Sequence, residues 1–469
     1  MALSADEGEN EPLPQDVKRK RSDGSKPKAK APPKSASAKL VDHITEQLGR
    51  SVPNETIQLC GLAPLKIIDF QPDHVLELAR QKLTTWKYEH VPTCWRRLYE
   101  EASLHLVVEE LPLLEKSMKW GLGEGGNSKE DSEYAFSSIV KHLDGALVIA
   151  GAPGRRSLVE EILNHLDTIA LQLFEHRQPN RLTIKPPPAL KTAHPISRAP
   201  QALDFAEFQV HLGTRSPIII PNTFNHWTAK NRWVDTTYLK KRTLGGHRLV
   251  PIEIGASYNE SGWAQNLIPF GEFIDRYLTP TEPEDKGYLA QHDLFAQTPA
   301  LMDDISIPDY CYSTPPRPKG AAAETPGLDK VKEVDQPLMN AWLGPSGTKS
   351  PLHTDPYHNV LCQVVGYKYV RLYAPEERDK LYPAGLDDNG VPMNNTSQVD
   401  IQHFRPGVAE PTPEQDKTRK FWQKKYPLFE FAPYQEAILR PGDCLYIPLG
   451  WWHYFEAFTP SFSVSFWWN

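Results

Sequence analysis

The sequence of 469 residues predicts an α+β protein in which an N-terminal helical domain precedes a C-terminal, barrel-like antiparallel β domain. Three observations support this class. Apolar residues in 41–177 recur at helical spacing, whereas 201–469 contains short β-rich runs interrupted by turn residues. The stretch 178–200, which is rich in proline and basic residues, separates these two parts. We therefore predict a tail (1–40), a helical domain, a proline-rich linker and a β domain with these bounds.

The composition is that of an ordinary globular chain with two or three domains. It is 39% hydrophobic and 24% charged, with a formal net charge of -7, so any basic surface must be local. The cysteines are scattered without a CxxC pair, which argues against a disulfide framework or a zinc ribbon. No run approaches the ~18 apolar residues of a membrane helix, and the N-terminus lacks the apolar core of a secretory signal. We expect an intracellular protein without membrane association.

Residues 1–40 contain almost no large apolar side chains, so we expect them to be disordered. They carry two basic clusters, KRKR at 18–21 and the lysines at positions 26, 28, 30 and 34. This arrangement is typical of a bipartite nuclear import signal. The alternative is a solvated, nonspecific basic tail, and the same charges could make weak contacts with nucleic-acid phosphates. We expect a nuclear location, with the cytoplasm as a second location.

The helical domain is predicted from three stretches, at 73–86, 95–106 and 158–173. The third has the broadest apolar stripe: Leu158, Val159, Ile162, Leu163, Leu166, Ile169, Ala170 and Leu173. Such stripes usually form the core of a helical bundle, and docking of a partner is the secondary interpretation. We find no catalytic pattern in this part of the chain.

The β domain is predicted from short strand patterns. The runs 217–221 and 249–254 are β-rich, and 361–373 and 436–448 each predict strands around a glycine-containing turn. The segment SFSVSF at 461–466 alternates with period two. Short strands that recur in this way predict a barrel-like, antiparallel architecture.

His353, Asp355 and His453 are candidate metal ligands. Residues two apart on a strand point to the same face, so His353 and Asp355 can reach one ion, and His453 lies near a strand that could return beside the first. Two histidines and one carboxylate leave three coordination positions open, as in non-haem iron(II) oxygenases. A structural zinc site is normally closed by four protein ligands. An isolated HxD pair also occurs by chance, so the pair needs independent support.

Lys368 supplies part of that support. It follows the turn at Gly366 and shares a strand face with Val370 and Leu372. A lysine on an apolar inner face needs an anionic partner, and the far carboxylate of 2-oxoglutarate is such a partner. From the spacing alone, an outward-facing lysine is an equally good interpretation.

Five separated segments are similar, in order, to a known family. They are GYLAQHDLF (287–295), DISIPDYC (304–311), the run 341–373, NTSQVD (395–400) and SFSVSFWW (461–468). Together they resemble the JmjC oxygenases, and within them the JmjC-only hydroxylases. The resemblance is close over 205–469 and fainter over 84–102.

This resemblance implies a double-stranded β-helix of the cupin or jelly-roll type, with Fe(II) as the metal and 2-oxoglutarate and O2 as co-substrates. It implies that the catalytic iron ligands are His353, Asp355 and His453. It also implies four residues around 2-oxoglutarate, which are Tyr288, Ser350, Asn359 and Lys368. Without the family, Ser350 and Asn359 would equally be a turn residue and a loop cap. Trp342 and Trp467 are expected to help wall the pocket, although buried tryptophans are usually core.

The substrate implied by the resemblance is a protein or peptide. One hypothesis is stable hydroxylation of a side chain, with arginine favoured because the resembling group includes arginyl hydroxylases. The second is demethylation of N-methyl-lysine in a histone tail, and the third is a non-enzymatic chromatin or protein-binding scaffold. The complete ligand set argues against the scaffold, and the absence of cysteine-rich reader modules in this sequence favours hydroxylation.

Two segments are longer than is usual in the family, 312–336 and 401–427. Both are rich in proline and charge, so we expect surface loops that influence the choice of peptide.

Overall fold

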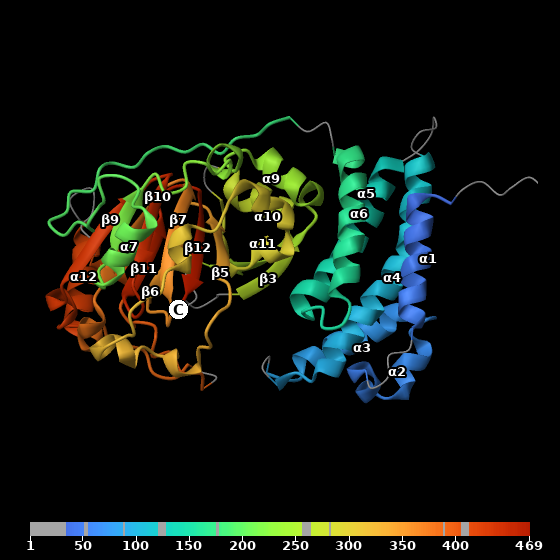
Figure 1. Cartoon of the computed structure of the whole chain (residues 1–469), viewed down its shortest axis with the longest axis horizontal. Helices are drawn as coiled ribbons and strands as arrows, with labels where there is room; N and C mark the ends of the chain where they lie inside the picture. The colour runs from blue at the N-terminus through green and yellow to red at the C-terminus, as the bar shows by residue number, and fades with distance from the viewer. Residues whose placement is uncertain are drawn as a thin grey trace, which may run out of the picture.

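The computed structural model describes residues 34–50, 55–87, 90–120, 128–174, 178–255, 264–280, 283–387, 390–404 and 412–469. The basic clusters at 18–30 lie outside these residues. A bundle of helices forms one end of the molecule and a strand-rich body forms the other (Figure 1). This is the predicted α+β class, with the helical part first. In the described part of the chain, no helix is both long and apolar enough to cross a membrane.

The helical end is built from consecutive helices and short 3-10 or π turns. These are α1 (Ala36–Gly49), η1 (Thr56–Cys60), α2 (Leu62–Ile67), α3 (Pro72–Thr84), α4 (Thr93–Trp120), α5 (Ser128–Asp144), η3 (Gly145–Ile149) and α6 (Arg156–Phe174). The predicted stripe on α6 is confirmed, because it is buried from Leu158 to Ala170. Helix α1 begins inside the predicted tail, since Ser35 caps it and Leu40 and Ile44 are buried.

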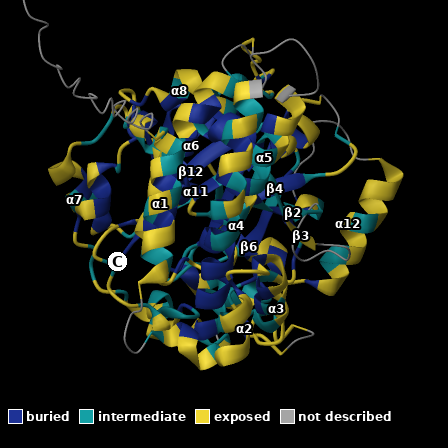
Figure 2. Ribbon diagram, turned by 90° about the vertical axis from the view of Figure 1, so that its right-hand side faces the viewer, coloured by how far each residue is buried: buried dark blue, intermediate teal, exposed yellow. Residues whose placement is uncertain are grey.

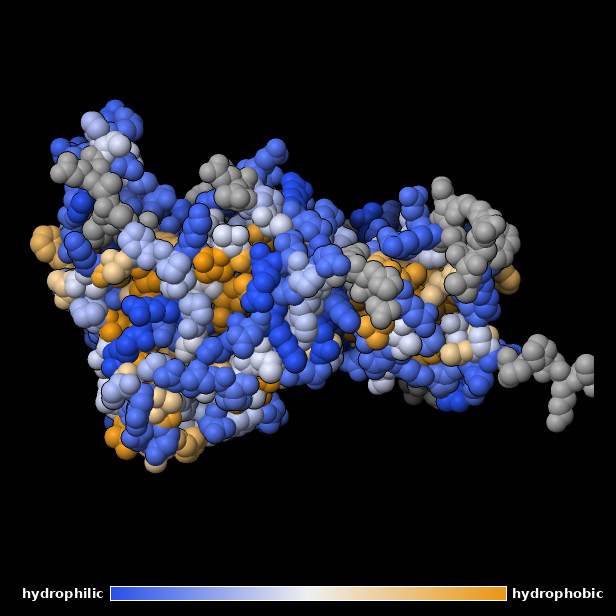
Figure 3. All heavy atoms as spheres, turned by 90° about the horizontal axis from the view of Figure 1, so that it is seen from above, coloured by the Kyte–Doolittle hydropathy of each residue, from blue (hydrophilic) through white to orange (hydrophobic). Residues whose placement is uncertain are grey.

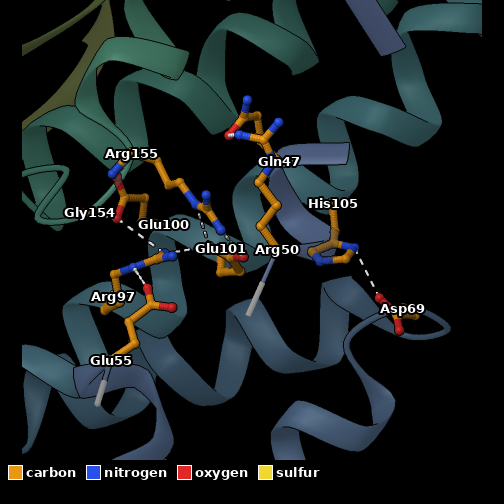
Figure 4. Close-up of polar contacts among 10 residues, drawn as sticks. All are labelled: Gln47, Arg50, Glu55, Asp69, Arg97, Glu100, Glu101, His105, Gly154 and Arg155. Atoms are coloured by element: carbon orange, nitrogen blue, oxygen red, sulfur yellow. Dashed lines mark hydrogen bonds and ion pairs between the residues drawn. The ribbon is translucent and has the colours of Figure 1, made fainter. Parts of the chain in front are cut away.

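A buried ion network fastens α4 to its neighbours (Figure 4). Arg97 pairs with Glu55 at 2.5 Å, with Glu100 at 3.3 Å and with Glu101. Glu100 also accepts a hydrogen bond from the backbone N–H of Arg155 at 2.6 Å. Because buried charges need partners, the network fixes η1 and the start of α6 against one face of α4.

The strand-rich body contains two antiparallel sheets. Its strands are β1 (Ile218–Pro221), β2 (Leu249–Ile254), β3 (Ala264–Pro269), β4 (Gly287–His292), β5 (Leu338–Gly344), β6 (Lys349–His353), β7 (His358–Val365), β8 (Lys368–Tyr373), β9 (Tyr434–Leu439), β10 (Asp443–Ile447), β11 (Trp452–Ala457) and β12 (Ser461–Trp468). The larger sheet has the order β1-β10-β7-β12-β5-β4-β2-β3, and the smaller has the order β6-β11-β8-β9. The strands predicted in 361–373, 436–448 and 461–466 are confirmed.

The short helices and turns of this body lie between the strands. They are α7 (Phe205–Leu212), α8 (Ala229–Arg232), α9 (Thr236–Arg242), η4 (Leu244–Gly246), α10 (Phe270–Phe273), η5 (Ile274–Leu278), α11 (Leu294–Gln297), η6 (Pro299–Asp304), η7 (Asp309–Tyr312), η8 (Gly320–Glu324), η9 (Leu328–Lys330), η10 (Pro375–Lys380), η11 (Ile401–His403), α12 (Pro413–Lys425) and η12 (Phe429–Phe431). Helices with exposed faces surround the buried strands (Figure 2). Seen from above, most of the surface is hydrophilic, and apolar side chains form separate patches on it (Figure 3).

The chain winds between the two sheets and so forms a double-stranded β-helix. From β6 to β8 it passes from the smaller sheet to the larger and back, and β10, β11 and β12 alternate in the same way. At the β7–β8 crossover, Gly366 has φ 78°, and a Cβ there would lie 2.0 Å from the carbonyl oxygen of Pro460. Glycine is therefore required at this turn. Leu361, Val370 and Leu445 belong to one core that draws side chains from both sheets.

The proline-rich stretch 178–200 lies along the open edges of both sheets. Its backbone makes a parallel bridge to the edge of β9 at Glu436 and another to the edge of β1 at Ile219. The N–H of Ile196 donates to the carbonyl of Glu436 at 3.2 Å, and Arg198 forms a bidentate pair with Asp443 at 2.7 and 2.8 Å. The stretch therefore covers edges that would otherwise be free to pair with another strand.

A buried polar hub joins the helical end to the strand-rich body. The carboxylate of Asp144, at the end of α5, accepts hydrogen bonds from Arg248 at 2.8 Å and from the N–H of Leu249 at 2.6 Å. Gln297 donates to the same carboxylate at 3.0 Å, and its Oε1 lies 2.6 Å from Nε2 of His292. The hub thus connects α5 with the start of β2 and the end of β4.

The prediction of a surface loop over all of 401–427 is wrong for 413–425, which form α12. Thr412 and Gln415 make a capping box, and Pro413 occupies the first helical position, so the start of the helix is strongly specified. Trp422 stacks on His403 with ring centroids 5.0 Å apart, which fixes the inner face of the helix.

Candidate metal and co-substrate site

The two candidate histidines meet across paired strands. His353 ends β6 and His453 lies near the start of β11, and the two residues are direct partners in the antiparallel register. Their ring centroids are 4.2 Å apart. Asp355 lies just beyond the end of β6 rather than on the strand, but its Oδ2 is 3.4 Å from Nε2 of His453 and 3.8 Å from Nε2 of His353.

The surroundings prepare these side chains to bind a metal. Nδ1 of His353 lies 2.7 Å from the carbonyl oxygen of Pro351, and Nδ1 of His453 lies 3.0 Å from that of Trp451. A proton on each Nδ1 satisfies these carbonyls and leaves each Nε2 as a lone pair aimed at the common centre. Burial, followed by the charge of its histidine partner, lowers the pKa of His353 to about 4, so the ring is neutral near pH 7.

The carboxylate completes the set. Burial alone would raise the pKa of Asp355, but the two histidines outweigh it and the pKa lies below its ordinary value. Its buried Oδ2 has no hydrogen-bond partner among the described residues. Among the described residues, this is the one group of three or more His, Cys, Asp or Glu side chains whose ligand atoms all lie within 4.8 Å of one another. An orphaned carboxylate oxygen facing two imidazole lone pairs fits a divalent transition metal.

Lys368, at the start of β8, lies in the same pocket and is only 2% exposed. Its Nζ donates to the hydroxyl of Tyr288 at 3.3 Å, and burial lowers the pKa of the amine to about 7. Burial raises the pKa of Tyr288, partly offset by the hydroxyl of Ser350, so the phenol remains a neutral donor. The structure thus brings together three of the four residues predicted around 2-oxoglutarate.

The fourth, Asn359 on β7, lines the same pocket, and in the part of the chain that the structure describes its buried Oδ1 has no hydrogen-bond partner. Trp342 and Trp467 form part of the wall, as expected. The indole of Trp342 donates to Ser465 at 2.8 Å, whereas the buried Nε1 of Trp467 finds no hydrogen-bond partner within the described ranges. Unpaired polar atoms are rare in protein interiors, so those of Asn359 and Trp467 indicate a pocket built for a polar guest.

Glu253 on β2 was not among the predicted site residues. It is the direct register partner of Tyr288, and its charge contributes to the raised pKa of the phenol. One weak signal was available in the sequence, a glutamate inside the apolar run 249–254. Its place beside the pocket depends on the pairing of β2 with β4, which sequence spacing does not specify.

Comparison with known proteins defines the class of this chain. A family model described as a cupin-like domain matches residues 205–469, which is the strand-rich body and the whole candidate site. The two-sheet fold and the His-Asp-His cluster are both consistent with this family match. The chain belongs to the cupin-like family, within its JmjC proteins.

Individual relatives narrow the position within that family. The chain is 39% identical over 293 residues to Jumonji C domain-containing protein 5 of Drosophila melanogaster, covering 60% of this chain and 63% of the relative. It is 39% identical over 279 residues to lysine-specific demethylase 8 of Xenopus tropicalis, covering 60% and 53%. The match to lysine-specific demethylase 8 of Danio rerio is 34% over 410 residues and covers 84% and 86%. The first two matches span less than two thirds of those relatives, and the third includes most of the helical end.

Proposed function

We propose that this protein is an Fe(II)- and 2-oxoglutarate-dependent oxygenase that hydroxylates a protein side chain, with arginine as the favoured target. The observation that carries the proposal is Lys368. Among the described residues its amine pairs with the hydroxyl of Tyr288 and with no carboxylate. A buried lysine of this kind is unfavourable unless an anion joins it, and Lys368 lies in the same small pocket as the His-Asp-His cluster.

The spacing along the strands supports this co-substrate. On the paired strands, His453 lies opposite Leu372 and Ala457 lies opposite Lys368. The backbone of Lys368 is therefore four residues along β8 from the position opposite His453. At about 3.3 Å per residue, this is roughly 13 Å. A lysine side chain and a short dicarboxylic acid laid end to end fit that interval.

When bound, iron supplies dioxygen activation coupled to decarboxylation of 2-oxoglutarate. His353, Asp355 and His453 would hold the metal from one side. Lys368 and Tyr288 bind the far carboxylate by charge-assisted and neutral hydrogen bonds.

Three further side chains shape the pocket. Asn359 offers a carboxamide that can orient the inner end of the co-substrate. Trp342 and Trp467 exclude water, which strengthens each polar contact inside the pocket.

The wall of the same pocket can contact a cationic substrate. Trp342 and Trp467 line it, and the ring of Trp342 is 6.1 Å from that of Tyr288. The faces of indole rings favour a guanidinium or a methylated ammonium group. Two of the relatives above are named lysine-specific demethylases, so removal of a methyl group from histone lysine is the alternative use of the same centre.

The test begins with anaerobic binding of metal and 2-oxoglutarate, followed by succinate release in air with candidate peptides. Turnover by the wild type and its loss in His353→Ala and Asp355→Ala would support the oxygenase. A peptide mass gain of one oxygen supports hydroxylation, and loss of a methyl group with formaldehyde supports demethylation. Folded wild-type protein that binds no metal and forms no succinate would instead favour a scaffold.

We also propose a nuclear location, on the basis of the basic clusters at 18–34. Fusion of residues 1–40 to a fluorescent reporter tests it. The reporter should enter the nucleus, and substitution of the KRKR cluster by alanines should prevent entry. The same fusion, tested with labelled DNA and RNA, measures the weak nucleic-acid contact expected of this tail.

A further inference from the structure

The segment Gly320–Lys330, here called the rim segment, lies at the end of the barrel where the candidate metal ligands lie. His353 ends β6 and His453 lies near the start of β11, so the β6–β7 and β10–β11 connections lie at that end. The rim segment packs on both connections. A substrate that reaches the cluster from this end of the barrel passes the rim segment, an inference that rests on the proposed function.

Its contact with the β10–β11 connection is close. Gly450 has φ 83°, and a Cβ at this position would lie 2.5 Å from Oγ1 of Thr325 and 3.4 Å from Cα of Ala322. The N–H of Gly450 donates to the carbonyl of Asp355 at 3.2 Å, which ties the two connections together. A glycine is therefore needed here both for its backbone conformation and for the approach of the rim segment.

Contact with the β6–β7 connection is lighter. A Cβ on Gly327 would lie 4.0 Å from Cγ of Pro356, the residue after Asp355. Thr325 is buried, which shows that the middle of the segment is packed down rather than projecting into solvent.

The chain on either side of the rim segment is anchored. Before it, Arg215 donates to the carbonyl of Arg317 and Gln209 to that of Thr314, each at 2.9 Å. After it, the side chain of Asn469 donates to the carbonyl of Lys332 at 3.0 Å. Such anchoring favours a fixed wall over a loosely tethered loop.

The outward face of this wall is identifiable. In a 3-10 helix residues three apart share a face, so Ala322 and Thr325 both turn toward Gly450. Ala323 and Glu324 are exposed on the other faces. Their side chains can meet a bound peptide without taking part in the packing of the segment.

We propose that the rim segment forms one wall of the groove that holds the peptide substrate, and that it determines which residues are accepted next to the target side chain. The metal and co-substrate pocket contains no residue of this segment. Changes at its exposed positions should therefore alter peptide binding and leave 2-oxoglutarate binding unchanged.

The test uses the full chain loaded anaerobically with Mn(II) and 2-oxoglutarate. Binding of fluorescent peptides with one central arginine and varied flanking residues is measured by anisotropy. The variants are Ala323→Trp and Glu324→Trp, with Ala63→Trp on α2 and Glu414→Trp on α12 as matched controls at exposed positions. We expect at least one rim variant to weaken the preferred peptides by about fivefold or more and to reorder their ranking, because an indole fills part of the groove.

The outcomes separate this inference from the proposed function. Controls should bind peptides as the wild type does, and all four variants should bind 2-oxoglutarate within about twofold of the wild type. Unchanged peptide ranking in both rim variants, or no peptide binding by a wild type that binds 2-oxoglutarate, would overturn the peptide wall. Failure of the wild type to bind metal and 2-oxoglutarate would contradict the proposed function itself.

Discussion

Replacing Lys368 by methionine should stabilise the protein while abolishing its use of 2-oxoglutarate. Burial lowers the pKa of this amine from 10.5 to about 7. Each pKa unit corresponds to about 1.36 kcal/mol, so holding the amine without an anion costs the folded protein about 4 kcal/mol at pH 7. A methionine of similar length removes this cost and packs with Val370 and Leu372. We expect the free energy of unfolding to rise by about 2 to 4 kcal/mol.

The same substitution leaves the far carboxylate of 2-oxoglutarate without its cation. Burying an unpaired charge is strongly unfavourable, so the Kd should rise at least about 100-fold. Anaerobic calorimetry with Mn(II) in place of iron measures this value, and urea denaturation of the unloaded protein measures stability. A Lys368→Met variant that binds 2-oxoglutarate like the wild type, or is less stable than the wild type, would refute the role assigned to this lysine.

The pKa of Lys368 also gives a pH dependence with a defined sign. The complex holds a protonated amine, whereas the free protein loses that proton above about pH 7, so affinity falls as pH rises. Between about pH 6.5 and 8.5 the Kd for 2-oxoglutarate should rise about 25-fold in the wild type and stay flat in Lys368→Arg if it binds, because guanidinium stays charged. His353→Ala should lose Mn(II) binding by calorimetry while its unfolding free energy remains within about 2 kcal/mol of the wild type. Asp144→Ala leaves a buried arginine unpaired and should destabilise the protein by about 3 to 5 kcal/mol in urea, and a loss below about 1 kcal/mol would contradict the hub.

The sequence predicted the strands and the cluster well because both depend on local patterns. Period-two alternation specifies which side chains share a strand face. The cluster of His353, Asp355 and His453 could be predicted because it requires only that the strand carrying His453 pairs beside the strand carrying His353. The choice between an inward and an outward Lys368 was left open by spacing. The structure decides it, since the two-sheet core places the start of β8 inside the pocket.

The features that the sequence did not predict depend on contacts between distant segments. Asp144 is separated from Arg248 by 104 positions, and neither residue lies in a recognisable motif. The stretch 178–200 has the composition of a linker, yet its backbone pairs with two sheet edges that exist only after folding. Composition indicates how an isolated segment behaves, which for this stretch is an extended linker. In the folded protein, pairing with the open edges of β1 and β9 determines its position instead.

The two proposed substrates differ in the contacts that their cationic groups can make. A guanidinium keeps its N–H donors and can bind a carboxylate through two parallel hydrogen bonds, whereas a trimethylated ammonium has no N–H to donate. The latter would depend on the faces of Trp342 and Trp467 instead. The wild type should therefore bind an arginine peptide at least about tenfold more tightly than the matched trimethyl-lysine peptide if it is an arginine hydroxylase, measured as peptide Kd with Mn(II) and 2-oxoglutarate bound. The reverse order, with Trp342→Leu harming the methylated peptide most, would favour demethylation over arginine hydroxylation.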